Sequence, residues 1–208
     1  GVLDLEAEIL STAERDVKNL TFEAELFDKS GNSLLAKPLS ASIAKIETEE
    51  SVKINLNATI KNIQPWTAET PVLYTLLLSL REKNGKVIEY KSMKVGFRSI
   101  ELKKGNMLVN GKAIMFYGVN RHEFNTDLGR ALTYDITEDD LLLLKRHNFN
   151  AIRTSHYPDA PHFYDLCDKY GMVIWAEIPY ISKHMPGGRE NTISQMKELV
   201  IQNYNHPS

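Results

Sequence analysis

Residues 150–158 read Asn150-Ala-Ile-Arg-Thr-Ser-His-Tyr-Pro158, and residues 171–179 read Gly171-Met-Val-Ile-Trp-Ala-Glu-Ile-Pro179. The first segment predicts a strand followed by a loop, and the second predicts a helix stop followed by another strand. Between them, apolar residues recur at the spacing of one helix face. Ionisable side chains follow each predicted strand. This order is typical of a βα barrel, in which functional groups sit at the carboxyl ends of the strands.

The βα order extends to both sides of this stretch. Residues 114–119 form a continuous apolar run, which predicts a strand covered on both faces. Residues 135–138, Asp-Ile-Thr-Glu, predict a helix start, and Asn148 can adopt the left-handed conformation that ends the helix. Residues 191–204 predict a third helix. Residues 113–204 thus predict β-α-β-α-β-α, three of the eight units that close a barrel. The positions expected on the inner face of the third helix are Ile193, Met196 and Val200.

The first hundred residues carry a different pattern, in which apolar and polar residues alternate without a helical period. Two sheets packed face to face, as in an immunoglobulin-like sandwich, would bury the apolar sides of such strands. Trp66 lies in a loop, where closing one end of the sandwich is favoured over stacking on a sugar. The predicted domains are therefore an all-β sandwich over residues 1–101 and an incomplete (β/α)8 barrel over residues 102–208. The expected strands cover residues 3–9, 20–26, 52–60, 73–80, 87–90 and 91–97.

Composition argues against several classes of protein. The chain has 208 residues and a net charge of −2, so nucleic acid is not an expected partner. Its one cysteine, Cys167, falls on the apolar face of a predicted helix, which favours an inert buried thiol. No apolar run is long enough to predict a membrane span. No signal peptide is visible, which favours a cytoplasmic location, although the chain opens on Gly1 without an initiator Met.

The predicted strand ends offer residues suited to a polyhydroxylated ligand. His122 and Glu123 follow the first strand, Arg153 and His156 the second, and Glu177 the third. In a parallel barrel these ends converge on one mouth. Imidazole and guanidinium groups there can exchange hydrogen bonds with hydroxyls, and an arginine can hold a carboxylate at two points.

Two other kinds of site have weaker support. Ser155 and His156 would form a poor nucleophile–base pair, because adjacent strand residues point to opposite sides and no G-x-S-x-G motif occurs. His156 and His162 lack the spacing of a helical zinc motif, and no cysteine ligand is near.

These residues also carry a resemblance to a known family. Residues 150–158, together with Phe163-Tyr164, Asp168 and the segment 171–175, resemble the first signature of glycoside hydrolase family 2, which contains β-galactosidases and β-glucuronidases. Three further segments resemble the family in the same order along the chain. They are Val95-Gly-Phe-Arg98, Leu108-Val-Asn-Gly111 and Gly118-Val-Asn-Arg-His-Glu123.

The resemblance implies an immunoglobulin-like domain followed by the first βα units of a TIM barrel. It also implies retaining hydrolysis by two carboxyl groups about 5–5.5 Å apart. Both are expected beyond Ser208, so the segment alone is expected to be inactive. By resemblance, His122 and His156 line the subsite for the non-reducing sugar, and Arg153 lies under the nucleophile. Glu177 would either contact the ligand or support Arg153.

The larger β-galactosidases of this family carry Glu-Thr-His after the third strand as magnesium ligands, whereas this chain has Ile181-Ser182-Lys183. The resemblance therefore implies no metal or other cofactor here. The segment 118–123 favours terminal β-D-galactosides as substrates of the full-length protein. A β-glucuronidase is the close alternative, and a non-catalytic carbohydrate-binding module is the alternative from another class.

We expect a carbohydrate partner, no membrane, and a homo-oligomeric full-length protein. The isolated segment should self-associate, because a barrel cut after three units exposes apolar edges.

Overall fold

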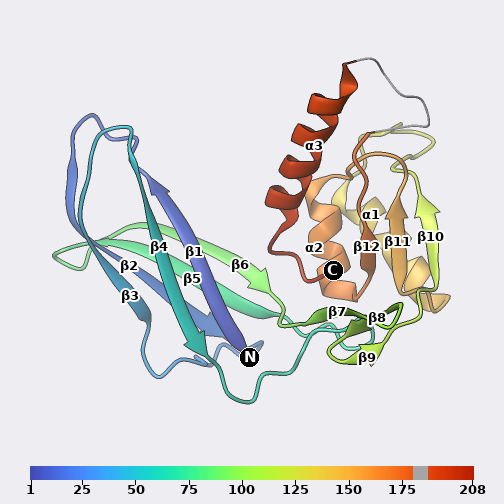
Figure 1. Ribbon diagram of the computed structural model, residues 1–208, viewed down its shortest axis with the longest axis horizontal. Helices are drawn as coiled ribbons and strands as arrows, with labels where there is room; N and C mark the ends of the chain where they lie inside the picture. The colour runs from blue at the N-terminus through green and yellow to red at the C-terminus, as the bar shows by residue number, and fades with distance from the viewer. Residues whose placement is uncertain (180–186) are drawn as a thin grey trace. The chain divides into compact units, whose positions relative to one another are not determined.

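The computed structural model describes residues 1–179 and 187–208 (Figure 1). The chain divides into two compact units, the first formed by Gly1–Gln64 with Leu73–Phe97 and the second by Pro65–Val72 with Arg98–Ser208. The sequence placed the boundary between residues 101 and 102. In the structure the chain passes into the second unit after Phe97, and the short segment 65–72 also belongs to that unit.

The first unit is the expected immunoglobulin-like sandwich, built from two antiparallel sheets. One sheet pairs β1 with β4, and the other has the order β3-β2-β5-β6 (Figure 1). The sequence missed β3, and it divided β6 into two segments that form one strand. The strands are β1 (Val2–Leu10), β2 (Val17–Phe27), β3 (Leu39–Ile46), β4 (Ser51–Thr59), β5 (Tyr74–Glu82) and β6 (Val87–Val95).

Side chains from both sheets form the core of the sandwich. Alternate residues of β2, such as Leu20 and Phe22, are buried against Ile54 of β4 and the apolar residues of β3. The period of two seen in the sequence is therefore the period of burial. The turn at Asn84 and Gly85 connects β5 to β6, with Gly85 at a positive φ of 87°.

The second unit holds a three-stranded antiparallel sheet and the βα units of the barrel. The small sheet contains β7 (Ile100–Lys103), β8 (Asn106–Val109) and β9 (Lys112–Ala113). The barrel strands β10 (Gly118–Arg121), β11 (Ala151–Thr154) and β12 (Val173–Trp175) run parallel and side by side (Figure 1). The helices are α1 (Tyr134–Arg146), α2 (Pro161–Tyr170) and α3 (Gly188–Asn203). None of these helices is long and apolar enough to cross a membrane.

Helices α1 and α2 cover one face of the parallel sheet. Leu141 of α1 and Phe163 and Leu166 of α2 pack with Ile152 of β11, and each of these side chains is almost fully buried. Helix α2 ends at Gly171 in the left-handed conformation, as expected. The N-cap of helix α1 is Thr133, two residues before Asp135, where the expected capping motif begins, because the Thr133 hydroxyl accepts the Ile136 N–H.

The strand expected over residues 114–119 is shorter in the structure. β10 starts at Gly118, and Met115, Phe116 and Tyr117 are all exposed. The side-chain amide of Asn150 explains this. Its Nδ2 donates to the Met115 carbonyl (3.0 Å) and its Oδ1 accepts the Tyr117 N–H (2.8 Å). This amide therefore takes up backbone groups that a longer strand would have used.

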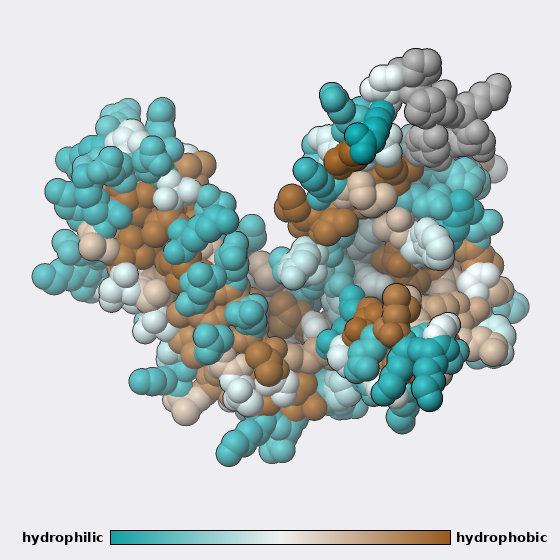
Figure 2. Space-filling model, in the orientation of Figure 1, coloured by the Kyte–Doolittle hydropathy of each residue, from teal (hydrophilic) through white to brown (hydrophobic). Residues whose placement is uncertain are grey.

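The predicted inner face of α3 is also wrong. Ile193, Met196 and Val200 are exposed, and the buried residue of the helix is Leu199. Figure 2 shows hydrophobic surface along this helix. Because Ile201 is exposed as well, apolar side chains lie on several sides of α3, and their spacing alone does not specify which side is buried.

Trp66 belongs to the second unit and is not open to a sugar. It is 1% exposed within the second unit, where its Nε1–H donates to the Asp168 carbonyl of α2 (2.9 Å). Its own carbonyl accepts the side-chain amide of Asn110 (3.0 Å). Lys145 reinforces the same region, since its Nζ donates to the carbonyls of Ala68 (3.0 Å) and Gly171 (3.1 Å). The favoured prediction, that Trp66 closes one end of the sandwich, is therefore wrong, and its burial leaves no ring face open for the sugar-stacking alternative.

Candidate functional site

The register of the parallel sheet places a row of polar and aromatic side chains on its open face. Asn120, Arg153 and Trp175 are neighbours across β10, β11 and β12. Ile152, one residue before Arg153, is buried against α1 and α2, so Arg153 points to the opposite face. Trp175 is 70% exposed on that face. One face of β12 is therefore exposed at Trp175.

Arg153 is the centre of the candidate site. Its Nε donates to Glu177 Oε1 (2.6 Å) and its Nη2 donates to Glu177 Oε2 (3.0 Å), which makes a two-point ion pair. Its Nη1 donates to Asn120 Oδ1 (3.2 Å). The guanidinium group is thus held by Asn120 on β10 and by Glu177, which follows β12.

Glu177 is positioned from two sides. The hydroxyl of Thr154, a fully buried residue, accepts the Glu177 backbone N–H (2.9 Å). The Arg153 guanidinium, with a smaller contribution from His156, lowers the pKa of the Glu177 carboxyl below its ordinary value. Glu177 is therefore an ionised partner of Arg153 near neutral pH. Of the two roles considered for Glu177, the structure shows the contact with Arg153.

The two histidines complete the cluster. His156 Nδ1 lies 3.1 Å from Glu177 Oε2 and 3.2 Å from Arg153 Nη2. The His122 ring meets the His156 ring edge-on, with 5.7 Å between centroids and an interplanar angle of 84°. The structure thus brings together all four residues expected at the site. Together they present cationic, anionic and imidazole groups at one edge of the sheet, which suits a ligand with many hydroxyls.

Arg121 forms an ionic network that the sequence did not reveal, with one buried partner, Asp159, and one partly exposed partner, Asp140. Arg121 is 6% exposed and donates to Asp159 Oδ2 (2.7 Å) and to Asp140 Oδ2 (2.9 Å). Its guanidinium also lies over the Phe163 ring, 5.1 Å from the centroid. Burial raises the pKa of Asp159 to about 6, against the opposing effect of Arg121. The network joins β10 to α1 and to the start of α2.

Glu123 has a structural role in this region. It is 8% exposed, and its Oε1 accepts the backbone N–H of Ala160, the N-cap residue of α2 (3.1 Å). A carboxylate at this position also interacts favourably with the helix dipole. Glu123 therefore fixes the start of α2 and does not project freely into the open site.

Ser155 and Cys167 are not nucleophiles in this arrangement. Ser155 is fully buried, and its hydroxyl donates to the Arg153 carbonyl (3.4 Å) and not to His156. Cys167 is fully buried, and burial raises the pKa of its thiol well above the ordinary value. A buried, protonated thiol is inert, as the sequence suggested.

One group of possible metal ligands occurs among the described residues, at Asp165, Asp168 and His206. Hydrogen bonds account for its buried member, since Asp168 Oδ2 meets His206 Nδ1 (2.6 Å) and Asp168 Oδ1 accepts the Ser208 N–H (3.0 Å). The cluster therefore fastens the end of the chain to α2. The magnesium site that the sequence argued against, at Ile181 and Lys183, lies outside the described residues and stays a prediction.

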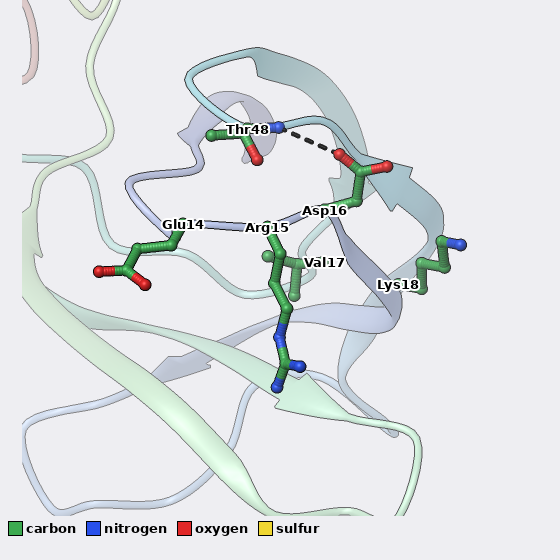
Figure 3. Close-up of a pocket in the computed structure, with 6 residues that line it drawn as sticks. All are labelled: Glu14, Arg15, Asp16, Val17, Lys18 and Thr48. Carbon is green, nitrogen blue, oxygen red and sulfur yellow. Dashed lines mark hydrogen bonds between the residues drawn. The ribbon is translucent and has the colours of Figure 1, made fainter.

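An open depression of about 780 Å³ lies in the sandwich unit, at the loops around Glu14 and Thr48 (Figure 3). The Thr48 N–H donates to Asp16 Oδ1 (3.4 Å), and Glu14, Arg15 and Lys18 point in different directions. Because these side chains do not converge, the depression lacks the arrangement of a specific ligand site.

Comparison with known proteins agrees with this architecture. Residues 100–208 match the family model described as "Glycosyl hydrolases family 2, TIM barrel domain", and residues 2–98 match the one described as "Glycosyl hydrolases family 2". The chain is similar to a β-galactosidase of Priestia megaterium, with 39% identity over 225 residues, 100% of this chain and 22% of that protein. It is also similar to a β-galactosidase of Alteromonas mediterranea, with 42% identity over 158 residues, 72% of this chain and 15% of that protein.

Among solved structures, a β-glucuronidase of Bacteroides uniformis matches with a TM-score of 0.88 and 30% identity, over 99% of this chain and 25% of that one. The chain thus spans between 15% and 22% of the length of these curated relatives and a quarter of this solved chain. The TIM-barrel family model covers more than half of its residues, and the chain therefore belongs to glycosyl hydrolases family 2.

Proposed function

We propose that the protein containing this chain is a retaining exo-β-glycosidase that hydrolyses terminal β-linked sugars, with β-D-galactosides as the favoured substrates. The observation that carries the proposal is the convergence of Arg153, Glu177, His156 and His122 at the carboxyl ends of the barrel strands. In this proposal the two histidines bind sugar hydroxyls, and Arg153 orients a carboxylate at the reacting centre.

Retaining hydrolysis uses two carboxyl groups, one as nucleophile and one as acid and then base. Two candidates on this chain already have other tasks. Glu177 is paired with Arg153 and His156, and Glu123 is buried at the start of α2. We therefore place both catalytic carboxyl groups outside residues 1–208 and expect no hydrolysis by the 208-residue chain alone. Turnover of a nitrophenyl β-glycoside by this chain, purified by itself, would contradict that assignment.

The sugar is decided by direct comparison of substrates on the whole protein. The similarity to β-galactosidases at 39% and 42% identity favours nitrophenyl β-D-galactoside. The similarity to a β-glucuronidase structure makes nitrophenyl β-D-glucuronide the competing substrate. A higher kcat/KM for the galactoside supports the proposal, and a higher value for the glucuronide supports the alternative. Binding of either sugar with no turnover would instead indicate a carbohydrate-binding module.

A further inference from the structure

Tyr157 follows His156 and is held in place by an arginine from another loop. The Arg130 guanidinium carbon lies over the Tyr157 ring, 3.8 Å from its centroid. The loop that carries Arg130 is closed by its own hydrogen bonds, since Asn125 and Gly129 exchange backbone N–H and carbonyl groups (2.7 and 2.9 Å). The Tyr157 ring therefore has a cation–π contact with Arg130 on one face.

The Tyr157 hydroxyl contacts two groups near the site. It accepts the backbone N–H of Glu123 (3.1 Å) and lies 3.4 Å from His122 Nδ1. Because the Glu123 N–H can only donate, the phenol oxygen is the acceptor in that bond and its own proton is free for His122. A neutral His122 that accepts this proton at Nδ1 carries its hydrogen on Nε2.

We infer that Tyr157, clamped by Arg130, is a positioning residue that holds His122 in the tautomer with a donor at Nε2. The inference rests on the proposed function, because the ligand of that donor is a sugar hydroxyl. An open concavity of about 490 Å³, lined by Tyr157, Arg130, Phe124, Glu123 and His122, leaves room for a ligand beside this imidazole.

The test distinguishes two roles of Tyr157, control of the His122 tautomer and support of the loop's shape. It measures the effect of Tyr157→Phe in two backgrounds of the whole protein. In the natural background, Tyr157→Phe keeps the ring and its contact with Arg130 but removes the hydroxyl. We expect kcat/KM for the preferred nitrophenyl glycoside to fall about three- to tenfold. In a His122→Gln background, the side-chain amide is a donor whatever Tyr157 does. There, Tyr157→Phe should have no further effect. A role limited to the loop's shape would give the same loss in both backgrounds, and that result would overturn the inference.

Two more variants complete the design. Tyr90→Phe is the control: it removes a tyrosine hydroxyl at an exposed position on β6 and should leave kcat/KM unchanged. Arg130→Gln removes the clamp at an exposed residue, which keeps the test usable if Tyr157→Phe fails to fold. It should lower kcat/KM about two- to fivefold in the natural background and not in the His122→Gln background. If the unaltered whole protein cleaves no glycoside, the proposed function itself fails. If it is active but the losses match in the two backgrounds, the inference alone fails.

Discussion

Arg153 and Glu177 form a two-point ion pair between β11 and the segment after β12, with N–O distances of 2.6 and 3.0 Å. The fork of the guanidinium matches the two oxygens of the carboxylate, a geometry that lysine cannot reproduce. The pair fixes Arg153 at the open face of the sheet. The lowered pKa of the Glu177 carboxyl keeps that group ionised near neutral pH. The first prediction follows from this geometry.

Arg153→Lys should lower kcat/KM of the whole protein by about tenfold or more, because one of the two hydrogen bonds to Glu177 is lost and the cation is no longer oriented. Steady-state kinetics on a nitrophenyl glycoside measure the loss. Arg146→Lys, at an exposed position near the end of α1, is the matched control and should change little. Equal activity of the two variants would show that Arg153 has no role in the site.

Gly171→Ala should destabilise the second unit. A Cβ at Gly171 would lie 2.2 Å from the Ala68 carbonyl oxygen, and the residue has a positive φ of 75°. Strain and crowding together should cost about 3 kcal/mol. The control is Gly111→Ala, which has a φ of 77° but no atom within 4 Å of the added Cβ. It should cost only about 1 kcal/mol. Calorimetric melting of the whole protein compares the two, and similar shifts would show that the crowding is relieved.

Trp66→Phe should also destabilise the second unit, because it removes the donor to the buried Asp168 carbonyl and leaves a cavity. The expected cost is about 2–4 kcal/mol. Binding of the glycoside should persist in the fraction that remains folded, since Trp66 is buried away from ligand. A selective loss of sugar affinity with unchanged melting would instead support the sugar-stacking role that the structure argues against.

The contact between His206 and Asp168 predicts a pH dependence. The hydrogen bond with Asp168 raises the pKa of His206 above 6.5, although partial burial opposes this. A raised folded-state pKa stabilises the protein fully at pH values below the unfolded pKa of about 6.5. The stabilisation is lost as the pH rises through the folded value. His206→Gln should therefore cost more stability at pH 5.5 than at pH 8.5, as measured by chemical denaturation at the two pH values. A cost that is the same at both pH values would contradict the prediction.

The 208-residue chain by itself should associate in solution. Ile193, Met196, Val200 and Ile201 expose apolar surface on α3, and Trp175 does so on the open face of the sheet. Sedimentation velocity over a range of concentrations measures the association. Replacing Val200 and Ile201 with Ser should reduce it, whereas a monomer at high concentration of the unaltered chain would refute it.

Much of the fold could be predicted because its signals are local. The alternation over residues 3–9 follows the burial of a strand, and Gly171 ends α2 because a residue without Cβ adopts positive φ easily. The errors occurred where a distant group competes with the local pattern. The Asn150 side-chain amide hydrogen-bonds to backbone groups of Met115 and Tyr117. Trp66 belongs to the second unit, although it lies between two strands of the sandwich in the sequence.

For the site, the sequence by itself determined which chemical groups are present and that they follow barrel strands. The reason is that the apolar pattern of each strand and the residues after it are local features of the sequence. Only the tertiary structure decided how they combine. It pairs Glu177 with Arg153, assigns Glu123 to the start of α2, and sets Tyr157 against His122. The physical reason is that hydrogen-bond partners are chosen by distance and direction between separate strands and loops, which strand register and loop closure fix only in the folded chain.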